Sequence, residues 1–343
     1  MTSKEILLHT IHLEKADRVP AIVLAGGNYE LNKEGMSFKD LLAMSPEEGA
    51  EWLIKEFDQM HSDIVWMAAG MNDLVLKALG GHVTYDQIGS PMEVDPMITK
   101  PEDLDKLDLD LIEKDPDIQK LLEMTREVKK RVGDEKVIGV SQWGSFTLAS
   151  LMLGTSQFMM DLVMEPDAIQ AILRFTRKIL LKWWNLFLDA GVDLICQAEP
   201  VASGDMIGAD MFDKFVLPHL KVTFRRVGDR AQAKMLHICG DTNGLLDRIP
   251  DTGAQLFSMD HKDDLALARR CLGGKVAFAG NLDPATVMVQ GTAEEVAKRA
   301  EEALEAADWA QGGYVLMPGC DLGQDTPQAN IDAMVEAAHS HKA

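Results

Sequence analysis

Two cysteines and a histidine stand out because of their residue types and their spacing. His237 and Cys239 lie two residues apart at the end of the apolar run 233–236, and Cys320 follows a similar apolar run, 313–319. Because residues i and i+2 of a strand point to the same face, His237 and Cys239 should project together from one strand tip. Two thiolates and one imidazole suit Zn²⁺ and leave one tetrahedral position open, which is typical of catalytic zinc.

A structural interpretation competes with the metal site. Cysteine is among the most buried residue types, and a histidine beside a cysteine is often a hydrogen-bonded core residue. Three residues taken from 4 Cys and 9 His can also meet the ligand-spacing rules by chance. The other two cysteines, Cys196 and Cys271, are interpreted as structural. The position of the three candidates in the fold therefore decides between the interpretations.

The elements that must position these residues alternate along the chain. The sequence predicts a helix at 3–15, a first strand at 21–25, and a helix opened by the capping box at 45–48. After a strand at 63–67 and a helix at 117–132, strands alternate with helices, and these strands are expected at 136–140, 193–196, 233–239, 254–258, 276–279 and 313–317. Repeated βαβ units with roughly eight strands predict an α/β fold, the (β/α)₈ TIM barrel.

The chain shows no low-complexity linker, so we predict a single barrel domain over residues 1–343 with an N-terminal helical extension. One irregular insertion is expected near 81–116. This stretch is acidic and contains Pro91, Pro96 and Pro101. Proline removes a backbone donor and interrupts helices and central strands, so little regular structure is expected there. The loop 144–147, by contrast, is expected to lead into a helix.

Polar residues follow the predicted strands at the same end as the zinc candidates, where barrel enzymes carry their chemistry. Gln142, Glu199 and Asn281 are expected to face the substrate. Asp260 ends the strand that follows the His237–Cys239 strand, and a carboxylate is an acceptable ligand, so we predict Asp260 as a displaceable fourth zinc ligand. For Glu199, Asp260 and Asn281 the alternative is a helix cap or, for Asp260, a role in orienting a ligand.

Composition limits the classes of partner. The net charge of −21 argues against nucleic acid, which requires concentrated Lys and Arg. No apolar run reaches about 18 residues, so no membrane span is expected. The N-terminal residues lack a signal-peptide core, and 4 scattered cysteines do not form a disulfide framework, so we expect a cytoplasmic protein.

Three motifs are similar to those of a known family. His-x-Cys-Gly at 237–240, Gly-Asn-x-Asp-Pro at 280–284 and Pro-Gly-Cys at 318–320 resemble the zinc-dependent methylcobamide:coenzyme M methyltransferases, within the wider uroporphyrinogen decarboxylase superfamily. The segments 144–149 and 199–203 are also similar to this superfamily. The resemblance covers most of the chain and implies a (β/α)₈ barrel in which His237, Cys239 and Cys320 bind catalytic zinc.

The resemblance also implies a reaction of one-carbon metabolism. A methyl group would pass from a methylated corrinoid (a methylcobamide or cobalamin), usually carried by a separate corrinoid protein, to a small thiol such as coenzyme M. A free thiol has a pKa near about 8.5, and only its thiolate attacks well, so a metal that ionises the thiol would accelerate the transfer. From their positions at these strand ends, Gln142, Glu199 and Asn281 would face the thiol or the corrinoid. The dimers of the superfamily make a homodimer plausible.

Three other functions remain open from the sequence. One is a demethylase methyltransferase that moves methyl from a methoxy compound or methylamine to a Co(I) corrinoid. Another is a non-catalytic module that binds a corrinoid or a metal. Uroporphyrinogen decarboxylase activity is disfavoured, because the segment 24–29 carries no arginine where the decarboxylases hold the carboxylates of their substrate.

Overall fold

The computed structural model describes residues 1–24, 28–68, 70–84 and 93–342. Its main sheet contains parallel strands in the order β1-β4-β5-β6-β7-β8-β9, and β2 and β3 form a separate antiparallel pair. The strands are β1 (Ile64–Met67), β2 (Val83–Thr84), β3 (Glu93–Val94), β4 (Val137–Trp143), β5 (Leu194–Ala198), β6 (Ala233–Ile238), β7 (Leu256–Met259), β8 (Ala277–Leu282) and β9 (Tyr314–Pro318).

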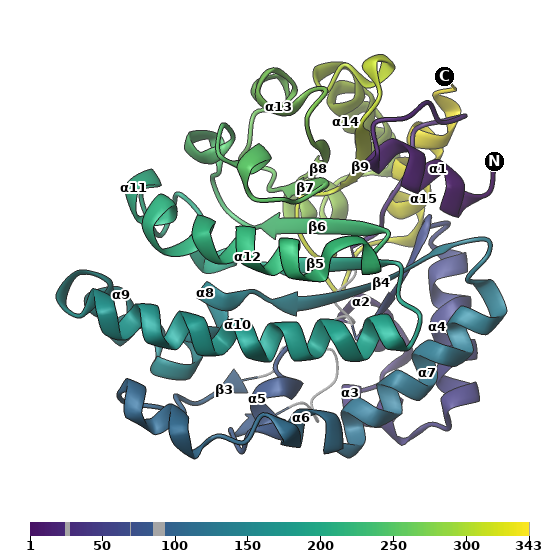
Figure 1. Cartoon of the computed structure of the whole chain (residues 1–343). Helices are drawn as coiled ribbons and strands as arrows, with labels where there is room; N and C mark the ends of the chain where they lie inside the picture. The colour runs from purple at the N-terminus through teal and green to yellow at the C-terminus, as the bar shows by residue number, and fades with distance from the viewer. Residues whose placement is uncertain (25–27, 69, 85–92, 343) are drawn as a thin grey trace.

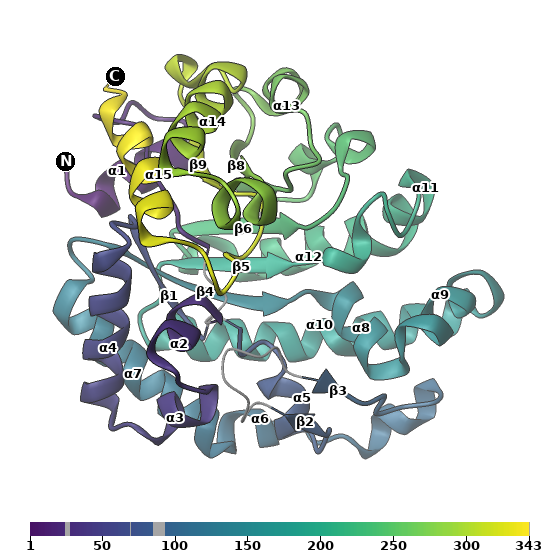
Figure 2. The same cartoon turned by 180° about the vertical axis from the view of Figure 1, so that it is seen from behind.

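Helices surround the curved sheet on its outer face (Figures 1 and 2). They are α1 (Ser3–Ile11), α2 (Asn28–Glu34), α3 (Phe38–Ala43), α4 (Pro46–Gln59), α5 (Leu74–Ala78), α6 (Asp110–Lys114), α7 (Pro116–Val132), α8 (Ser145–Leu153), α9 (Thr155–Met164), α10 (Pro166–Asp189), α11 (Ala209–Met211), α12 (Leu217–Val227), α13 (Leu265–Leu272), α14 (Ala293–Ala306) and α15 (Gln328–Ser340). In Figure 1 the arrows of β4 and β6 point toward the side where α9 and α11 lie, and the two termini lie on the opposite side.

The architecture is TIM-like, but the barrel is not closed by a continuous ladder of eight strands. The predicted first strand, 21–25, is wrong as a regular strand: its described part is extended and forms one isolated bridge, between Ala21 and Leu316 of β9. On its other side, Val23 N–H donates to the hydroxyl of Ser62 (3.2 Å) rather than to a strand carbonyl. Residue 25 lies outside the described residues. The segment fills the eighth position without completing the hydrogen-bond ladder.

The helix starts follow local capping chemistry. Ser45 caps α4 and completes the predicted capping box with Glu48, and Thr292 and Glu295 do the same at α14. The expected loop at 144–147 is wrong beyond its first residue, because α8 begins at Ser145 directly after Gly144. The reason is that Glu199, directly after β5, accepts hydrogen bonds from the amides of its first turn, so a local capping residue is not needed.

The predicted insertion at 81–116 contains short regular elements in its described part, so the expectation of little regular structure is wrong there. They are β2, β3, the 3-10 turn Pro101–Lys106 and α6. Pro101 occupies the first position of its turn, where a missing N–H costs nothing. Residues 85–92 lie outside the described residues.

No single helix in the described ranges is long and apolar enough to cross a membrane; α8 and α9 meet the length and composition limits only as a pair bent by 108°. The core lies between the sheet and the helices and includes the fully buried Trp66, Trp183 and Trp184. This packing fixes the strand ends that carry the site.

Candidate metal centre

The structure brings the three predicted zinc ligands together. His237 lies in β6, Cys239 follows the end of that strand, and Cys320 follows β9. His237 Nε2 lies 2.8 Å from Cys239 Sγ and 3.8 Å from Cys320 Sγ, and the two sulfur atoms are 2.9 Å apart. All three ligand atoms lie within 4.8 Å of one another. Side chains more than 80 residues apart in the sequence thus form one potential metal site.

Strand register and two glycines bring the ligands into this position. His237 is paired with Ala198 of β5 and Ser258 of β7, so these three side chains share one face of the sheet. Gly240 has φ +95°, a left-handed conformation that turns the chain directly after Cys239. At Gly319 a Cβ would lie 2.4 Å from the backbone nitrogen of His261, so only glycine lets the loop before Cys320 approach the loop after β7 this closely.

The orientation of the His237 ring is set by a neighbouring strand. His237 Nδ1 lies 2.8 Å from Ser258 Oγ, and the Ser258 hydroxyl donates to the sulfur of Met317 (3.7 Å). The Ser258 oxygen can therefore accept a hydrogen bond from Nδ1–H, which leaves the lone pair of Nε2 facing the two cysteines. A neutral imidazole held in this tautomer is ready to bind a metal.

The two thiols have very different proton affinities because they lie so close together. The hydrogen bond from Cys239 lowers the pKa of Cys320 to about 4, and the His237 ring beside it acts in the same direction. The same contact, together with burial, raises the pKa of Cys239. Burial lowers the pKa of His237, but the Cys320 thiolate outweighs this effect and the pKa is raised overall. The close contact therefore favours the thiolate form of Cys320 and the thiol form of Cys239.

Asp260 and Asn281 lie in the same region but make different contacts from those predicted. Asp260 Oδ2 accepts a hydrogen bond from the backbone N–H of Gly240 (2.9 Å), and Oδ1 accepts one from Lys262 N–H (3.1 Å). Asn281 Nδ2 donates to the backbone carbonyls of Asp260 (3.0 Å) and Asp263 (2.7 Å). Both side chains thus hold the loop after β7 against its neighbours. That Asp260 is a zinc ligand stays a prediction.

Gln142 and Glu199 are fully buried on the face of the sheet opposite to His237. Gln142 is paired with Gln197, and Gln197 with Leu236, whereas His237 points the other way. Glu199 accepts hydrogen bonds from the backbone N–H groups of Phe146 (3.3 Å) and Thr147 (2.9 Å) in the first turn of α8. Burial raises the pKa of Glu199. Glu199 makes no cap bond to the helix that follows β5. Its carboxylate instead satisfies the first turn of α8, which the capping alternative did not anticipate.

The sequence interpretation overlooked Ser258 and Asp263. Asp263 accepts hydrogen bonds from the backbone N–H and the hydroxyl of Thr242, both at 2.6 Å, and so ties the loop after β6 to the loop after β7. Burial raises the pKa of Asp263 to about 6. A signal for Ser258 was present: it lies two residues before Asp260 and therefore shares its strand face.

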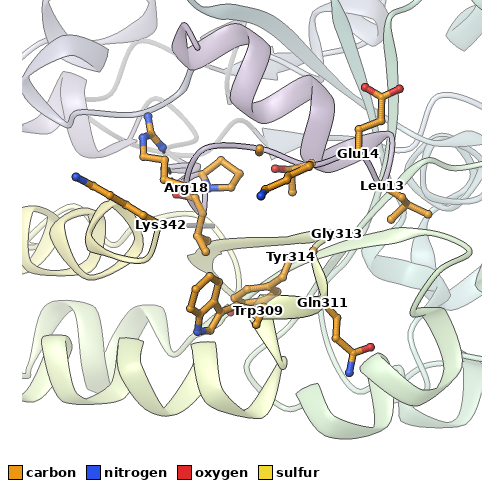
Figure 3. A pocket seen from close by; sticks show the side chains of 15 residues that line it. Leu13, Glu14, Arg18, Trp309, Gln311, Gly313, Tyr314 and Lys342 are labelled. Carbon is orange, nitrogen blue, oxygen red and sulfur yellow. Dashed lines mark hydrogen bonds between the residues drawn. The ribbon is translucent and has the colours of Figure 1, made fainter.

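A cavity of about 470 Å³ lies at the other end of the molecule, near the termini (Figure 3). Leu13, Arg18, Trp309, Tyr314 and Lys342 are among its lining residues. None of the predicted site residues lines it. A second cavity of about 320 Å³ lies beside the centre, between the loops after β7 and β8 and helix α14, and Asn281 lines it.

The whole chain matches a known family. The model of the family described as uroporphyrinogen decarboxylase (URO-D) matches residues 2–341. The chain belongs to this family. The methylcobamide:CoM methyltransferase MtbA of Methanosarcina mazei is 27% identical over 99% of this chain and 98% of that protein. A uroporphyrinogen decarboxylase of Chlorobium phaeobacteroides is 24% identical over 98% of this chain and 97% of that protein.

Solved structures agree on the fold of the family. A methyltransferase from Methanosarcina mazei superimposes with a TM-score of 0.87, at 24% identity, over 99% of both chains. A B12-independent methionine synthase from Shewanella has a TM-score of 0.53 at 15% identity, over 85% of this chain and 86% of that one. The predicted resemblance to the methylcobamide:coenzyme M methyltransferases of this superfamily is confirmed.

Proposed function

We propose that this protein is a zinc-dependent methyltransferase that moves a methyl group from a methylated corrinoid to a small thiol. The observation that carries the proposal is the convergence of His237, Cys239 and Cys320 at the carboxyl ends of β6 and β9. In a barrel these ends are where catalytic groups lie. The relatives named methylcobamide:CoM methyltransferases support the same reaction class.

The residues present fit a zinc ion. Nε2 of His237 and the sulfur atoms of Cys239 and Cys320 are the donors, and no fourth His, Cys, Asp or Glu ligand atom among the described residues lies within 4.8 Å of all three. With Zn–S bonds of about 2.3 Å, tetrahedral geometry separates two sulfur atoms by about 3.8 Å. The observed 2.9 Å must therefore increase by roughly 1 Å, a change that loop residues accommodate. Three donors leave a position for the substrate sulfur.

Bound zinc would keep the substrate thiol ionised at neutral pH. The residues of the chain prepare this site before the metal and the thiol arrive. Ser258 holds the imidazole of His237 with Nε2 toward the sulfur atoms, and Asp260 holds the Gly240 N–H next to Cys239. To act as a displaceable fourth ligand, Asp260 would bind zinc while its carboxylate still accepts hydrogen bonds from the N–H groups of Gly240 and Lys262. The second lone pair on each carboxylate oxygen permits this.

The transfer balances in atoms and electrons. The thiol loses its proton, its sulfur attacks the methyl carbon, and the carbon–cobalt bond breaks with both electrons remaining on cobalt. The products are a thioether, a proton and a Co(I) corrinoid. We propose that a separate corrinoid protein presents the methyl group in the cytoplasm.

One relative gives a specific reason to keep a methylated small molecule as donor in a second candidate. A methylated-thiol–coenzyme M methyltransferase of Methanosarcina mazei is 28% identical over 77% of this chain and 70% of that protein. The same three ligands would then bind the heteroatom of a methylated donor, with Co(I) as the acceptor. The demethylase reaction on a methoxy compound or methylamine belongs to this candidate.

The two candidates are separated by one assay on the zinc-loaded protein. With free methylcobalamin and a small thiol, we expect steady demethylation, seen as a change in the visible spectrum of the corrinoid. Cys320→Ala should abolish it, whereas Cys271→Ala, in α13 and outside the centre, should retain it. Inactivity with thiols together with methylation of Co(I) by a methyl ether or amine would overturn the proposal in favour of the second candidate.

A further inference from the structure

The loops at the carboxyl ends of the strands carry far more acid than base. We define the mouth loops as residues 70–73, 199–208, 239–248, 260–264, 283 and 319–327. Their acidic residues are Asp73, Glu199, Asp205, Asp241, Asp247, Asp260, Asp263, Asp264, Asp283, Asp321 and Asp325. Their only Lys or Arg residues are Arg248 and Lys262.

Both of these cations are already paired with carboxylates. Arg248 Nε lies 2.8 Å from Asp213 Oδ1, and Lys262 Nζ lies 2.8 Å from Asp205 Oδ2. Arg299, beside the cavity next to the centre, pairs with Glu302 at 2.7 Å. The segments outside the described ranges, 25–27, 69 and 85–92, contain no Lys or Arg in their sequence. The mouth loops therefore offer no unpaired cation to an anionic ligand.

Asp260, the acid that follows β7, is not paired with a Lys or Arg of the described chain. Asp260 is bound through the backbone N–H groups of Gly240 and Lys262, and its other contact is the His261 ring (2.8 Å). The two ligand thiolates would only balance the charge of one Zn²⁺. The loops around the open ligand position therefore hold more carboxylates than Lys and Arg side chains.

An unpartnered acceptor in the same loops points to a ligand that donates hydrogen bonds. Asn72 follows β1, its side chain is 7% exposed, and its Oδ1 accepts no hydrogen bond from the described residues. Next to it, Asp73 is bound by the indole N–H of Trp143 (2.7 Å), which comes from β4. A buried acceptor without a donor is costly unless a ligand or water supplies one.

We infer that the thiol used by this protein carries a neutral or cationic donor group at its far end, not the sulfonate of coenzyme M. This inference rests on the proposed function and specifies its substrate class. An ammonium or hydroxyl group would be attracted to the acidic mouth loops and could donate to Asn72. A sulfonate would be repelled by them and would find no unpaired cation there.

Three thiols that differ only in their tail test the inference. Cysteamine, 2-mercaptoethanol and 2-mercaptoethanesulfonate share a two-carbon spacer and carry a positive, a neutral and a negative tail. At low salt and equal thiolate concentration, we expect kcat/KM for methylcobalamin demethylation to be at least about tenfold higher for cysteamine than for the sulfonate. The ratio should shrink at about 0.5 M salt, where charges are screened within a few ångströms.

Matched variants locate the source of the preference. Asp205→Asn releases Lys262 from its ion pair, so the ratio should fall by roughly threefold. Asp229→Asn removes the same charge just before β6, at the far end of the barrel, and should leave the ratio unchanged. A kcat/KM for the sulfonate equal to or above that for cysteamine, or an equal shift in both variants, would overturn the inference while leaving the proposed function intact.

Inactivity with all three thiols would instead overturn the proposed function. Titration calorimetry of the same thiols with the zinc-loaded protein then decides the charge preference on its own. Tighter binding of cysteamine and 2-mercaptoethanol would support it, and tighter binding of the sulfonate would overturn it.

Discussion

The two ends of the barrel treat buried carboxylates in opposite ways. At the amino-terminal end, Asp63 accepts two hydrogen bonds from Arg18 (2.6 and 2.9 Å), and Asp193 is bound by Lys4 (2.9 Å) and Lys129 (2.7 Å). At the carboxyl end, Asp263 is bound by the amide and hydroxyl of one threonine, without a cation. Paired charges stabilise the base of the barrel, whereas the buried carboxylate of Asp263 at the mouth is held by neutral donors.

The positions of the carboxylates in the chain explain this difference. Asp63 and Asp193 precede β1 and β5, where elements from both ends of the chain supply cations. Burial raises the pKa of Asp63, but Arg18 and His339 outweigh this effect and hold it well below its usual range. At the mouth, Asp260 and Asp263 accept hydrogen bonds from backbone N–H groups, which hold these side chains in place without a Lys or Arg partner.

The largest expected effect is loss of stability at the base. Asp63→Ala leaves the Arg18 guanidinium without its partner, and breaking such a buried pair costs about 3–5 kcal/mol. Urea unfolding should show this loss at pH 7. Because the folded-state pKa of Asp63 is depressed, its contribution is present above the unfolded value of about 4 and is lost as the pH falls below it.

The exposed ion pair at the N-terminus provides the control for this prediction. Asp17 pairs with the terminal amine at 2.8 Å, but its side chain is 62% exposed, so Asp17→Ala should not shift the unfolding midpoint measurably. If Asp63→Ala were as stable as the wild type, the ion pairs at the base would not be what stabilises the barrel.

The next effect concerns the mouth and should leave stability nearly unchanged. Ser258→Ala removes the hydrogen bond that orients His237, and loss of such a partner lowers metal affinity by about 10–100-fold. Competition with a chromogenic chelator measures this affinity. Ser258→Thr keeps the hydroxyl and should bind zinc almost as tightly as the wild type. Equal zinc affinity in Ser258→Ala would show that the hydroxyl does not position the ring.

The smallest effect separates ligation from orientation at Asp260. If Asp260 is the displaceable fourth ligand, Asp260→Asn should retain zinc but alter the X-ray absorption spectrum at the zinc edge in the absence of thiol. Asparagine keeps an acceptor for the Gly240 N–H, so the loop should remain in place. Identical spectra for the two proteins would rule out ligation and leave Asp260 as a residue that only positions the loop.

Much of this site was predictable because it depends on local rules. Strand periodicity placed His237 and Cys239 on one face, and the convergence of strand ends placed Cys320 beside them. The direction of Gln142 and Glu199 was not predictable from position alone. The sheet register places Gln142 on the face opposite His237, and Glu199, directly after β5, binds the first turn of α8.

The first strand shows a second limit of sequence patterns. The apolar run at 21–25 has the composition of a strand, and its described part is buried in the eighth position of the barrel. Whether the segment forms a regular ladder depends on the groups that lie opposite it. Here the Val23 N–H donates to the Ser62 hydroxyl instead of to the carbonyl of a neighbouring strand. Such pairing is set by tertiary contacts. The extent of the domain, predicted as residues 1–343, stays a prediction.

Zinc content measured by elemental analysis tests the central claim most directly. We expect about one zinc per chain in the wild type and in Cys271→Ala, consistent with one catalytic site. We expect loss of most of this zinc in Cys239→Ala and in Cys320→Ala, with both variants still folded because the core of the barrel does not include the site. Full zinc retention in these two variants would contradict the account.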